Sequence, residues 1–327
     1  MKILITGGAG FLGTRLARTL LRRKHILGRP FTELVLADLA EPAADLAGDT
    51  QVRCLVGPLI EHCEALAKET FDVVFHMAGA VSRECEADFQ LGMRSNLDTS
   101  RALLEALREA GNRPRFVLAS SVAVFGSDPG VPLPAVVRDN TLPTPQSSYG
   151  IQKFICEQLV ADYTRKGFID GRSGRLMTVA VRPIPANGAA SGFLSAIVRE
   201  PLNDTDAVCP VPPEMAVALA SPRNTVNDLI TLVEAESGAL GGRTAINFPA
   251  LTVTVGEILD ALETVGGKAA RARVRFEADP AITSIVGSWP SVFESTRGAG
   301  LGLLPDPDMI SIVRQFMNEH GAVRVEA

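Results

Sequence analysis

The run KILITGGAGFLG, residues 2–13, decides the fold of this chain. Its first five residues form a mostly apolar segment typical of a buried parallel strand, and the glycines that follow open a helical pattern. Gly7 permits a tight turn, Gly10 lets the backbone approach a pyrophosphate, and Gly13 allows helix and strand to pack closely. The spacing is Gly-x-x-Gly-x-x-Gly rather than Gly-x-Gly-x-x-Gly. We therefore expect a dinucleotide site, with the helix N-terminus facing the phosphate charge.

Short β-rich runs alternate with longer helical patterns up to Pro183. The predicted strands are residues 2–6, 33–37, 52–56, 72–77, 115–119 and 176–181, and the predicted helices are residues 12–23, 87–110 and 149–166. Strict alternation implies right-handed crossovers with helices on both faces. The expected fold is therefore α/β, a Rossmann-type doubly wound parallel sheet.

Prolines interrupt this regularity beyond Pro183. The later predicted helices are residues 193–199, 224–237, 252–265 and 309–320, and the later predicted strands are 244–248 and 271–277. Gly266 and Gly267 are expected to end the third of these helices. We expect residues 1–185 and 223–250 to form the dinucleotide-binding domain, and residues 186–222 and 251–327 a smaller, discontinuous C-terminal substrate domain.

Bulk properties exclude several classes of function. The formal charge of −5 offers no broad attraction to nucleic acid or to anionic membrane. No apolar run approaches 18 residues, so neither a membrane span nor a signal peptide is indicated, and a cytoplasmic location is expected. The five cysteines lack close pairing and the four histidines lack ligand-like spacing, so no metal site is expected. His76 is interpreted as a hydrogen-bonded core residue.

Asp38 ends the second predicted strand, where the adenosine ribose of a bound dinucleotide would lie. Its carboxylate could accept hydrogen bonds from both ribose hydroxyls. No arginine or lysine follows closely to pair with a 2′-phosphate, so the expected cofactor is NAD rather than NADP. The alternative is an ordinary turn carboxylate.

Tyr149 and Lys153 form the candidate proton-transfer couple. Tyr149 is one of only two tyrosines and stands four residues before Lys153, so both point to one face of a helix. A free tyrosine has a pKa near 10, and ionising it near neutral pH costs about 4 kcal/mol. One ammonium at about 4 Å, in an effective dielectric of about 20, supplies about that much. The alternative is an exposed tyrosine beside a solvated lysine.

Ser121 closes the fifth predicted strand at its carboxyl end, the edge where open α/β sheets hold ligands. It can orient a substrate oxygen while Tyr149 takes the proton. The alternative for Ser121 is a loop cap.

These motifs together resemble the extended short-chain dehydrogenase/reductase family, which includes the nucleotide-sugar epimerases, over roughly the first 185 residues. The resemblance implies that Ser121, Tyr149 and Lys153 are the catalytic triad. It also implies a cofactor site formed by Gly7, Gly10, Phe11, Leu12, Gly13, Asp38, Ala78, Gly79, Ala80, Asn96, Tyr149, Lys153 and Pro183. Asn96 would stabilise the site, and a homodimer through residues 87–110 and 149–166 is implied as well.

Residues 81–89, 182–191 and 199–202 resemble a branch of this family that oxidises the C2 hydroxyl of a four-carbon sugar acid with NAD. The implied substrate residues are Ser82, Ser121, Tyr149, Asn187 and Arg199. Arg199 is the first choice for binding the carboxylate, with Arg182 and Arg223 next. The chain departs from relatives at residues 184–186 and at Pro58, where an adenine-reading aspartate is common.

Two other functions remain open. A nucleotide-sugar 4-epimerase or reductase shares the triad but must hold a diphosphate, and a non-catalytic NAD sensor commonly lacks the tyrosine or the lysine. Dehydration is disfavoured, because Val122 and Ala123 stand where dehydratases of the family carry an acidic pair.

Overall fold

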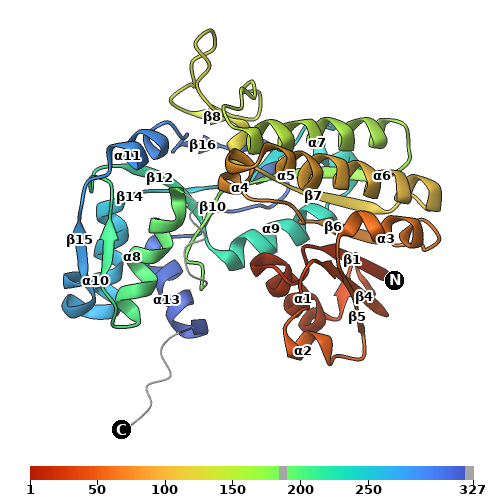
Figure 1. Cartoon of the computed structure of the whole chain (residues 1–327), viewed down its shortest axis with the longest axis horizontal. Helices are drawn as coiled ribbons and strands as arrows, with labels where there is room; N and C mark the ends of the chain where they lie inside the picture. The colour runs from red at the N-terminus through yellow and green to blue at the C-terminus, as the bar shows by residue number, and fades with distance from the viewer. Residues whose placement is uncertain (184–189, 321–327) are drawn as a thin grey trace.

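A computed structural model describes residues 1–183 and 190–320 and contains a seven-stranded parallel sheet. The strand order is β13-β9-β7-β6-β1-β4-β5 (Figure 1). The strands are β1 (Lys2–Thr6), β4 (Glu33–Asp38), β5 (Val52–Val56), β6 (Val73–His76), β7 (Arg115–Ser121), β9 (Asp170–Leu176) and β13 (Ile246–Asn247). Because β1 lies centrally and carries the glycine turn at its carboxyl end, the sheet presents that turn beside the ends of β4 and β6.

Helices cover both faces of this sheet, as the alternating pattern predicted. One face packs against α1 (Phe11–Arg23), α2 (Ala44–Ala47) and α9 (Pro222–Glu234). The other packs against α3 (Leu59–Leu66), α6 (Thr99–Ala110) and α7 (Ser148–Arg165), with α4 (Ser82–Ala87), α5 (Phe89–Gly92) and the π-helix η1 (Met93–Asp98) leading into α6. Within β1, Ile3 and Ile5 face the first set and Leu4 the second, which is the period-2 alternation of a buried strand. The doubly wound architecture is confirmed.

The predicted strand at residues 176–181 is wrong. The chain enters the main sheet earlier, as β9, and only Thr178–Val179 then form β10 of another sheet. The sequence of β9, DGRSGRL, has two arginines and two glycines, so its hydrophobicity gives no strand signal. It is nevertheless buried, because its charges are matched by neighbouring groups.

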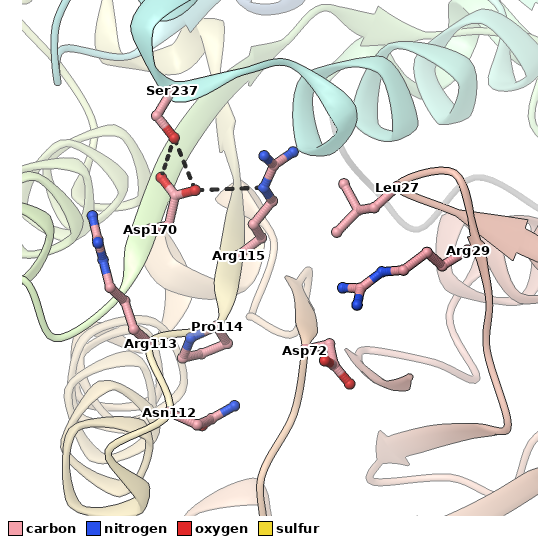
Figure 2. Close-up of a pocket in the computed structure, with 9 residues that line it drawn as sticks. All are labelled: Leu27, Arg29, Asp72, Asn112, Arg113, Pro114, Arg115, Asp170 and Ser237. Carbon is pink, nitrogen blue, oxygen red and sulfur yellow. Dashed lines mark hydrogen bonds and ion pairs between the residues drawn. The ribbon is translucent and has the colours of Figure 1, made fainter.

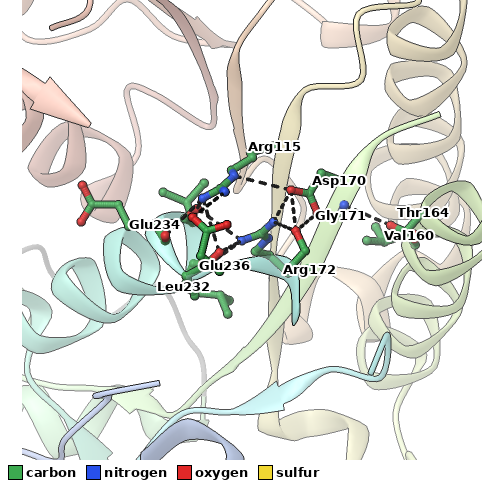
Figure 3. Close-up of polar contacts among 12 residues, drawn as sticks. Arg115, Val160, Thr164, Asp170, Gly171, Arg172, Leu232, Glu234 and Glu236 are labelled. Atoms are coloured by element: carbon green, nitrogen blue, oxygen red, sulfur yellow. Dashed lines mark hydrogen bonds and ion pairs between the residues drawn. The ribbon is translucent and has the colours of Figure 1, made fainter. Parts of the chain in front are cut away.

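The C-terminus of α9 supplies much of that matching (Figure 3). Arg115 donates from Nη1 to the carbonyl oxygen of Val233 at 3.0 Å, and Arg172 donates to that of Ala235 at 2.7 Å. Asp170 pairs with both guanidinium groups. Burial lowers the pKa of Arg172, and Asp170 opposes that shift. Arginines here satisfy helix carbonyls that would otherwise lack donors, and they complement the helix dipole.

A second hydrophobic core lies beside the first (Figure 1). Its sheet has the order β10-β12-β14, with β12 (Ala216–Ala220) and β14 (Leu251–Thr254) antiparallel. Around it lie α8 (Phe193–Leu202), α10 (Val255–Ala272), α11 (Pro280–Gly287), α13 (Met309–His320) and the pair β11 (Ala207–Cys209) and β15 (Val274–Phe276). Gly267, at φ 84°, is non-helical and divides α10 into two helical segments at a kink, so the predicted end of the first segment at Gly266 and Gly267 is confirmed. Leu303, from the segment expected in the substrate domain, packs in the first core.

Short elements complete the described chain. They are β2 (His25–Ile26), β3 (Arg29–Pro30), η2 (Val122–Val124), β8 (Val137–Arg138), η3 (Ala190–Gly192), η4 (Ser237–Leu240), β16 (Phe293–Glu294) and α12 (Thr296–Gly300). The parallel pair β8 and β16 joins the loop after β7 to the segment before α12. None of the helices described is both long and apolar enough to cross a membrane.

Candidate functional site

Ser121 is the last residue of β7 and lies at the carboxyl edge of the sheet. Its backbone is extended, and its Oγ accepts a hydrogen bond from the Ala123 amide at 3.1 Å, which caps the short helix η2. The hydroxyl hydrogen is left to donate elsewhere. Ser121 can therefore be both a loop cap and a substrate-orienting residue, because a hydroxyl that accepts a hydrogen bond from an amide can still donate one to a substrate oxygen.

The start of α7 is held directly against η2. Ser147 caps the helix, accepting from the Gly150 amide at 3.1 Å, and Glu86 accepts from the Ser148 amide at 2.7 Å. A Cβ at Gly150 would lie 2.1 Å from the carbonyl oxygen of Ala123, so only glycine permits this approach. Tyr149 is thereby fixed in the first turn of α7, against the segment that follows Ser121.

Lys153 follows one turn later and is only 5% exposed. Its Nζ donates to the carbonyl oxygen of Ala119 at 3.0 Å and lies 5.7 Å from the centre of the Tyr149 ring. Burial, followed by the positive charge of Lys153, lowers the pKa of His76 to about 3. His76 bridges the hydroxyls of Thr6 and Ser100 at 2.7 and 2.8 Å, which confirms it as a hydrogen-bonded core residue.

The glycine turn has the shape that a dinucleotide requires. Gly7 has φ of +73°, and a Cβ at Gly13 would lie 2.0 Å from the carbonyl oxygen of Gly7. Asp38 reaches the turn from the end of β4, and its Oδ2 accepts from the amides of Ala9 at 2.9 Å and Gly10 at 3.2 Å. Phe11 and Leu12 begin α1 at this point. Amide donors, a helix N-terminus and a carboxylate suit the phosphates and ribose of NAD.

The loop after β6 closes the other side of the turn. A Cβ at Gly7 would lie 2.8 Å from the Ala78 amide nitrogen, and a Cβ at Gly79 would lie 2.5 Å from Asn96 Oδ1. Asn96 donates to Gln152 Oε1 at 2.8 Å and to the carbonyl oxygen of Ala80 at 3.3 Å. Asn96 therefore ties the loop at residues 78–80 to the helix that carries Tyr149 and Lys153.

The candidate arginines occupy different positions. Arg199 is 5% exposed, and its guanidinium donates to Glu200 and, at 3.0 Å, to the carbonyl oxygen of Arg182. Arg182 donates from Nε to the carbonyl oxygen of Val179 at 3.0 Å. Burial lowers the pKa of Arg182, and the electrostatic interaction with Tyr149 opposes this shift. Within residues 1–183 and 190–320, the terminal nitrogens of Arg182 have no hydrogen-bond partner.

Ser82, Pro183 and Asn187 are the other residues predicted to contact the substrate or the cofactor. Ser82 begins α4, whose first turn is closed by Glu84 accepting from the Val81 amide at 2.9 Å. Pro183 is half-buried directly after Arg182. Asn187 lies outside the described residues.

Comparisons with known proteins identify the family of the chain. Residues 3–211 match the model of the NAD dependent epimerase/dehydratase family. The chain belongs to this family. Its curated relatives include D-erythronate dehydrogenase of Cupriavidus necator, 44% identical over 99% of this chain and 100% of that protein. D-erythronate dehydrogenase of Haemophilus influenzae is 41% identical over 97% of this chain and 99% of that protein.

Solved structures share the whole fold. The nucleoside-diphosphate-sugar epimerase from Agrobacterium tumefaciens has a TM-score of 0.89 and 38% identity, covering 98% of this chain and 95% of that one. L-threonine 3-dehydrogenase from Trypanosoma brucei has a TM-score of 0.83 at 24% identity, with 98% of each chain covered. The latter is a likeness of fold alone.

A separate pocket lies at the opposite, amino-terminal edge of the sheet (Figure 2). This cavity of about 340 Å³ is lined by Leu27, Arg29, Asp72, Asn112, Arg113, Pro114, Arg115, Asp170 and Ser237. Asp170 forms an ion pair there with Arg115 and accepts a hydrogen bond from Ser237, whose Oγ lies 2.9 Å from both carboxylate oxygens. Open α/β sheets hold their ligands at the carboxyl ends of the strands, which is the edge opposite to this pocket.

Two charged residues behind the triad were not predicted from the sequence. Glu157 stands four residues after Lys153 on α7, and Arg175 lies on β9. Glu157 continues the four-residue spacing of Tyr149 and Lys153, which was a usable signal. Arg175 had none, because the predicted strand began one residue after it.

Proposed function

We propose that this protein oxidises the C2 secondary hydroxyl of a small sugar acid with NAD, and that D-erythronate is its substrate. One observation carries the proposal. Ser121, Tyr149 and Lys153 lie at the ligand edge of a sheet whose glycine turn suits NAD, in a chain more than 40% identical, over nearly its whole length, to two D-erythronate dehydrogenases.

In this proposal the Tyr149 oxygen removes the proton of the substrate hydroxyl. Ser121 donates a hydrogen bond to that oxygen and orients it. The buried ammonium of Lys153 stabilises the negative tyrosine oxygen, because a charge enclosed by protein acts through a low dielectric. Bound NAD would supply the hydride acceptor that oxidation of the C2 alcohol to a ketone requires. Gly7, Gly10, Asp38 and the loop at residues 78–80 would hold the cofactor.

We assign the substrate carboxylate to Arg182 rather than to Arg199. The charge of Arg182 acts on Tyr149, and its terminal nitrogens can form a two-point bond with a carboxylate. Arg199 is enclosed and braces the backbone of Arg182 instead. We also propose that Ser82 and Asn187 contact the substrate and that Pro183 contacts the cofactor.

The two domains and the oligomeric state also have proposed roles. Residues 1–185 and 223–250 would hold NAD, and residues 186–222 and 251–327 would hold the sugar acid, in a cytoplasmic homodimer. Support for the dimer comes from three exposed apolar side chains on α5 and α7, since Phe89, Ile151 and Ile155 are 56%, 47% and 37% exposed.

NADH formation with a panel of sugar acids tests the activity. We expect turnover with D-erythronate and NAD, much weaker turnover with NADP, and a loss of at least about 100-fold in kcat for Tyr149→Phe. Tyr163→Phe is the matched control, because Tyr163 hydrogen-bonds Glu105 on α6, away from the triad. Normal turnover by the Tyr149 variant would refute the mechanism.

A nucleotide-sugar epimerase is the second candidate, favoured by the 38% identity to the Agrobacterium protein that carries that name. It predicts conversion of a nucleotide sugar without net NADH formation. Tight NAD binding with no turnover of either substrate class would instead support the sensor hypothesis.

A further inference from the structure

A buried ion pair lies directly behind the triad. Glu157 of α7 is 3% exposed and Arg175 of β9 is 4% exposed. Arg175 donates from Nε to Glu157 Oε1 at 2.9 Å and from Nη2 to Oε2 at 2.7 Å. Its guanidinium also lies 4.8 Å from the centre of the Phe125 ring and donates to Asn247 Oδ1 at 3.3 Å. This two-point geometry is rigid, because it satisfies both carboxylate oxygens with a planar donor.

The pair is bonded to both elements that carry the triad. Ser120, the neighbour of Ser121, donates from Oγ to Glu157 Oε1 at 2.6 Å, and Ser120 stands opposite Arg175 in the register of β7 and β9. Lys153 is fixed to the same strand through its 3.0 Å bond to the carbonyl oxygen of Ala119. Helix α7 is therefore fastened to the end of β7 at two successive turns, just after Tyr149.

The charges of the pair bear on Tyr149 as well. Tyr149, Lys153 and Glu157 recur every four residues and share one face of α7, so Glu157 is one turn from Lys153 and about 12 Å along the axis from Tyr149. An unpaired carboxylate there would oppose the positive field of Lys153 at the tyrosine oxygen. Arg175 cancels that carboxylate.

We propose that Glu157 and Arg175 are positioning residues of the reaction. The pair sets the distance between α7 and the end of β7, and its zero net charge leaves the field of Lys153 at Tyr149 undiminished. The kinetic part of this inference rests on the proposed dehydrogenase activity, whereas the electrostatic part does not.

The two tyrosines of the chain permit a direct test without substrate. In a Tyr163→Phe background, the tyrosinate absorbance during a pH titration reports Tyr149 alone. Arg175→Met should raise the midpoint by about one pH unit, the size expected for one unpaired charge at about 12 Å in an effective dielectric of about 20. Glu157→Gln should lower it by a similar amount. The double variant, which carries no buried net charge, should return close to the parent midpoint.

Midpoints that do not move, or that move in the same direction for both single variants, would overturn the inference. If Arg175→Met fails to fold, Arg175→Lys replaces it: the charge is kept and the two-point geometry lost, so the midpoint should hold while kcat with D-erythronate falls at least about 10-fold. Unchanged kcat in that variant would overturn the positioning role. Failure of the parent enzyme to oxidise any sugar acid would refute the proposed function and leave the titration result standing.

Discussion

The ammonium nitrogen of Lys153 lies 5.7 Å from the centre of the Tyr149 ring and is screened from solvent by the surrounding protein. In the described chain its hydrogen bond goes to a backbone carbonyl, that of Ala119, and not to a carboxylate. Its full positive charge is therefore available to the tyrosine oxygen. Because charges are screened less in a buried site than in water, this interaction is stronger than the interaction between the same two side chains on a helix surface.

Lys153→Met removes that charge while keeping the volume of the side chain. We expect kcat for sugar-acid oxidation to fall by about 100-fold to 10,000-fold, the range of a lost acid–base contribution. Lys166→Met, at the exposed C-cap of the same helix, should leave kcat within about twofold. Steady-state kinetics measure kcat for both variants, after circular dichroism has shown that each is folded like the wild type. An active Lys153→Met enzyme would show that Tyr149 needs no cationic neighbour.

Arg182→Met should raise KM for the sugar acid by about 100-fold, the loss expected when a two-point bond to a carboxylate is removed. NAD affinity should be unchanged, as isothermal titration would show. Arg223→Met is the control, because Arg223 pairs with Glu319 at 3.1 Å and is 57% exposed. A larger rise in KM for the control than for Arg182→Met would contradict the assignment.

The sheet strands up to β7 and the helices α1, α6 and α7 were predictable from sequence, because hydrophobic period and glycine spacing report the environment directly. Helices α2, α3 and α4 were not predicted, and the helix expected over residues 87–110 is divided into α5, η1 and α6. Strand β9 was not predictable, because its burial depends on long-range partners. Arg172 is matched by α9, 60 residues further on, and Arg175 by Glu157 of α7. No local pattern can reveal that a charge in a strand has found its counter-charge elsewhere in the fold.

The candidate site divides in the same way. Tyr149 and Lys153 were predictable because helical spacing alone puts them on one face. The ranking of the arginines was not predictable, because the sequence does not show which guanidinium nitrogens are already hydrogen-bonded within the fold. In the structure Arg199 donates to the carbonyl oxygen of Arg182, whereas the side-chain hydrogen bond of Arg182 uses Nε and leaves its terminal nitrogens for a ligand.

Ile151→Asp should convert the proposed dimer to a monomer. Ile151 is 47% exposed on α7, and a carboxylate facing its counterpart across a symmetric apolar interface would be costly. Ile285→Asp on α11 is the matched control, since Ile285 is equally exposed at 47%. Light scattering after size exclusion measures the change. A wild-type protein that is already monomeric would refute the dimer.

Asp228→Asn should make stability less sensitive to pH. Asp228 is 4% exposed on α9, and burial, followed by the charge of Asp306, raises its pKa to about 8. Unfolding between about pH 4 and pH 8 therefore releases a proton, so the wild-type free energy of unfolding falls by up to about 1.4 kcal/mol per pH unit as pH rises. The variant lacks this loss, and its melting temperature should exceed that of the wild type at pH 8 by more than at pH 5.

Exposed Asp260 supplies the control for that experiment. Asp260→Asn should shift both melting curves together, with no widening of the difference at pH 8. Parallel pH profiles for wild type and Asp228→Asn would mean that Asp228 is ionised in the folded protein.

Glu319→Gln should loosen the contact between the last helix and the first. Glu319 of α13 receives two hydrogen bonds from Arg15 of α1, at 2.6 and 2.7 Å, and one from Arg223 of α9. Burial would raise the pKa of Glu319, but these bonds prevail and lower it to about 2.

The lowered pKa fixes the pH window of that contact. Its stabilisation is fully present above the unfolded value of 4.5 and is lost as pH falls through about 2. At neutral pH we expect Glu319→Gln to cost about 2 kcal/mol in the free energy of unfolding. Denaturant titration at pH 7 and pH 3 measures it, and the gap between variant and wild type should narrow at the lower pH. Glu294→Gln is the control, because Glu294 pairs with Arg138 at a site where both side chains are more than half exposed, and it should change stability little at either pH.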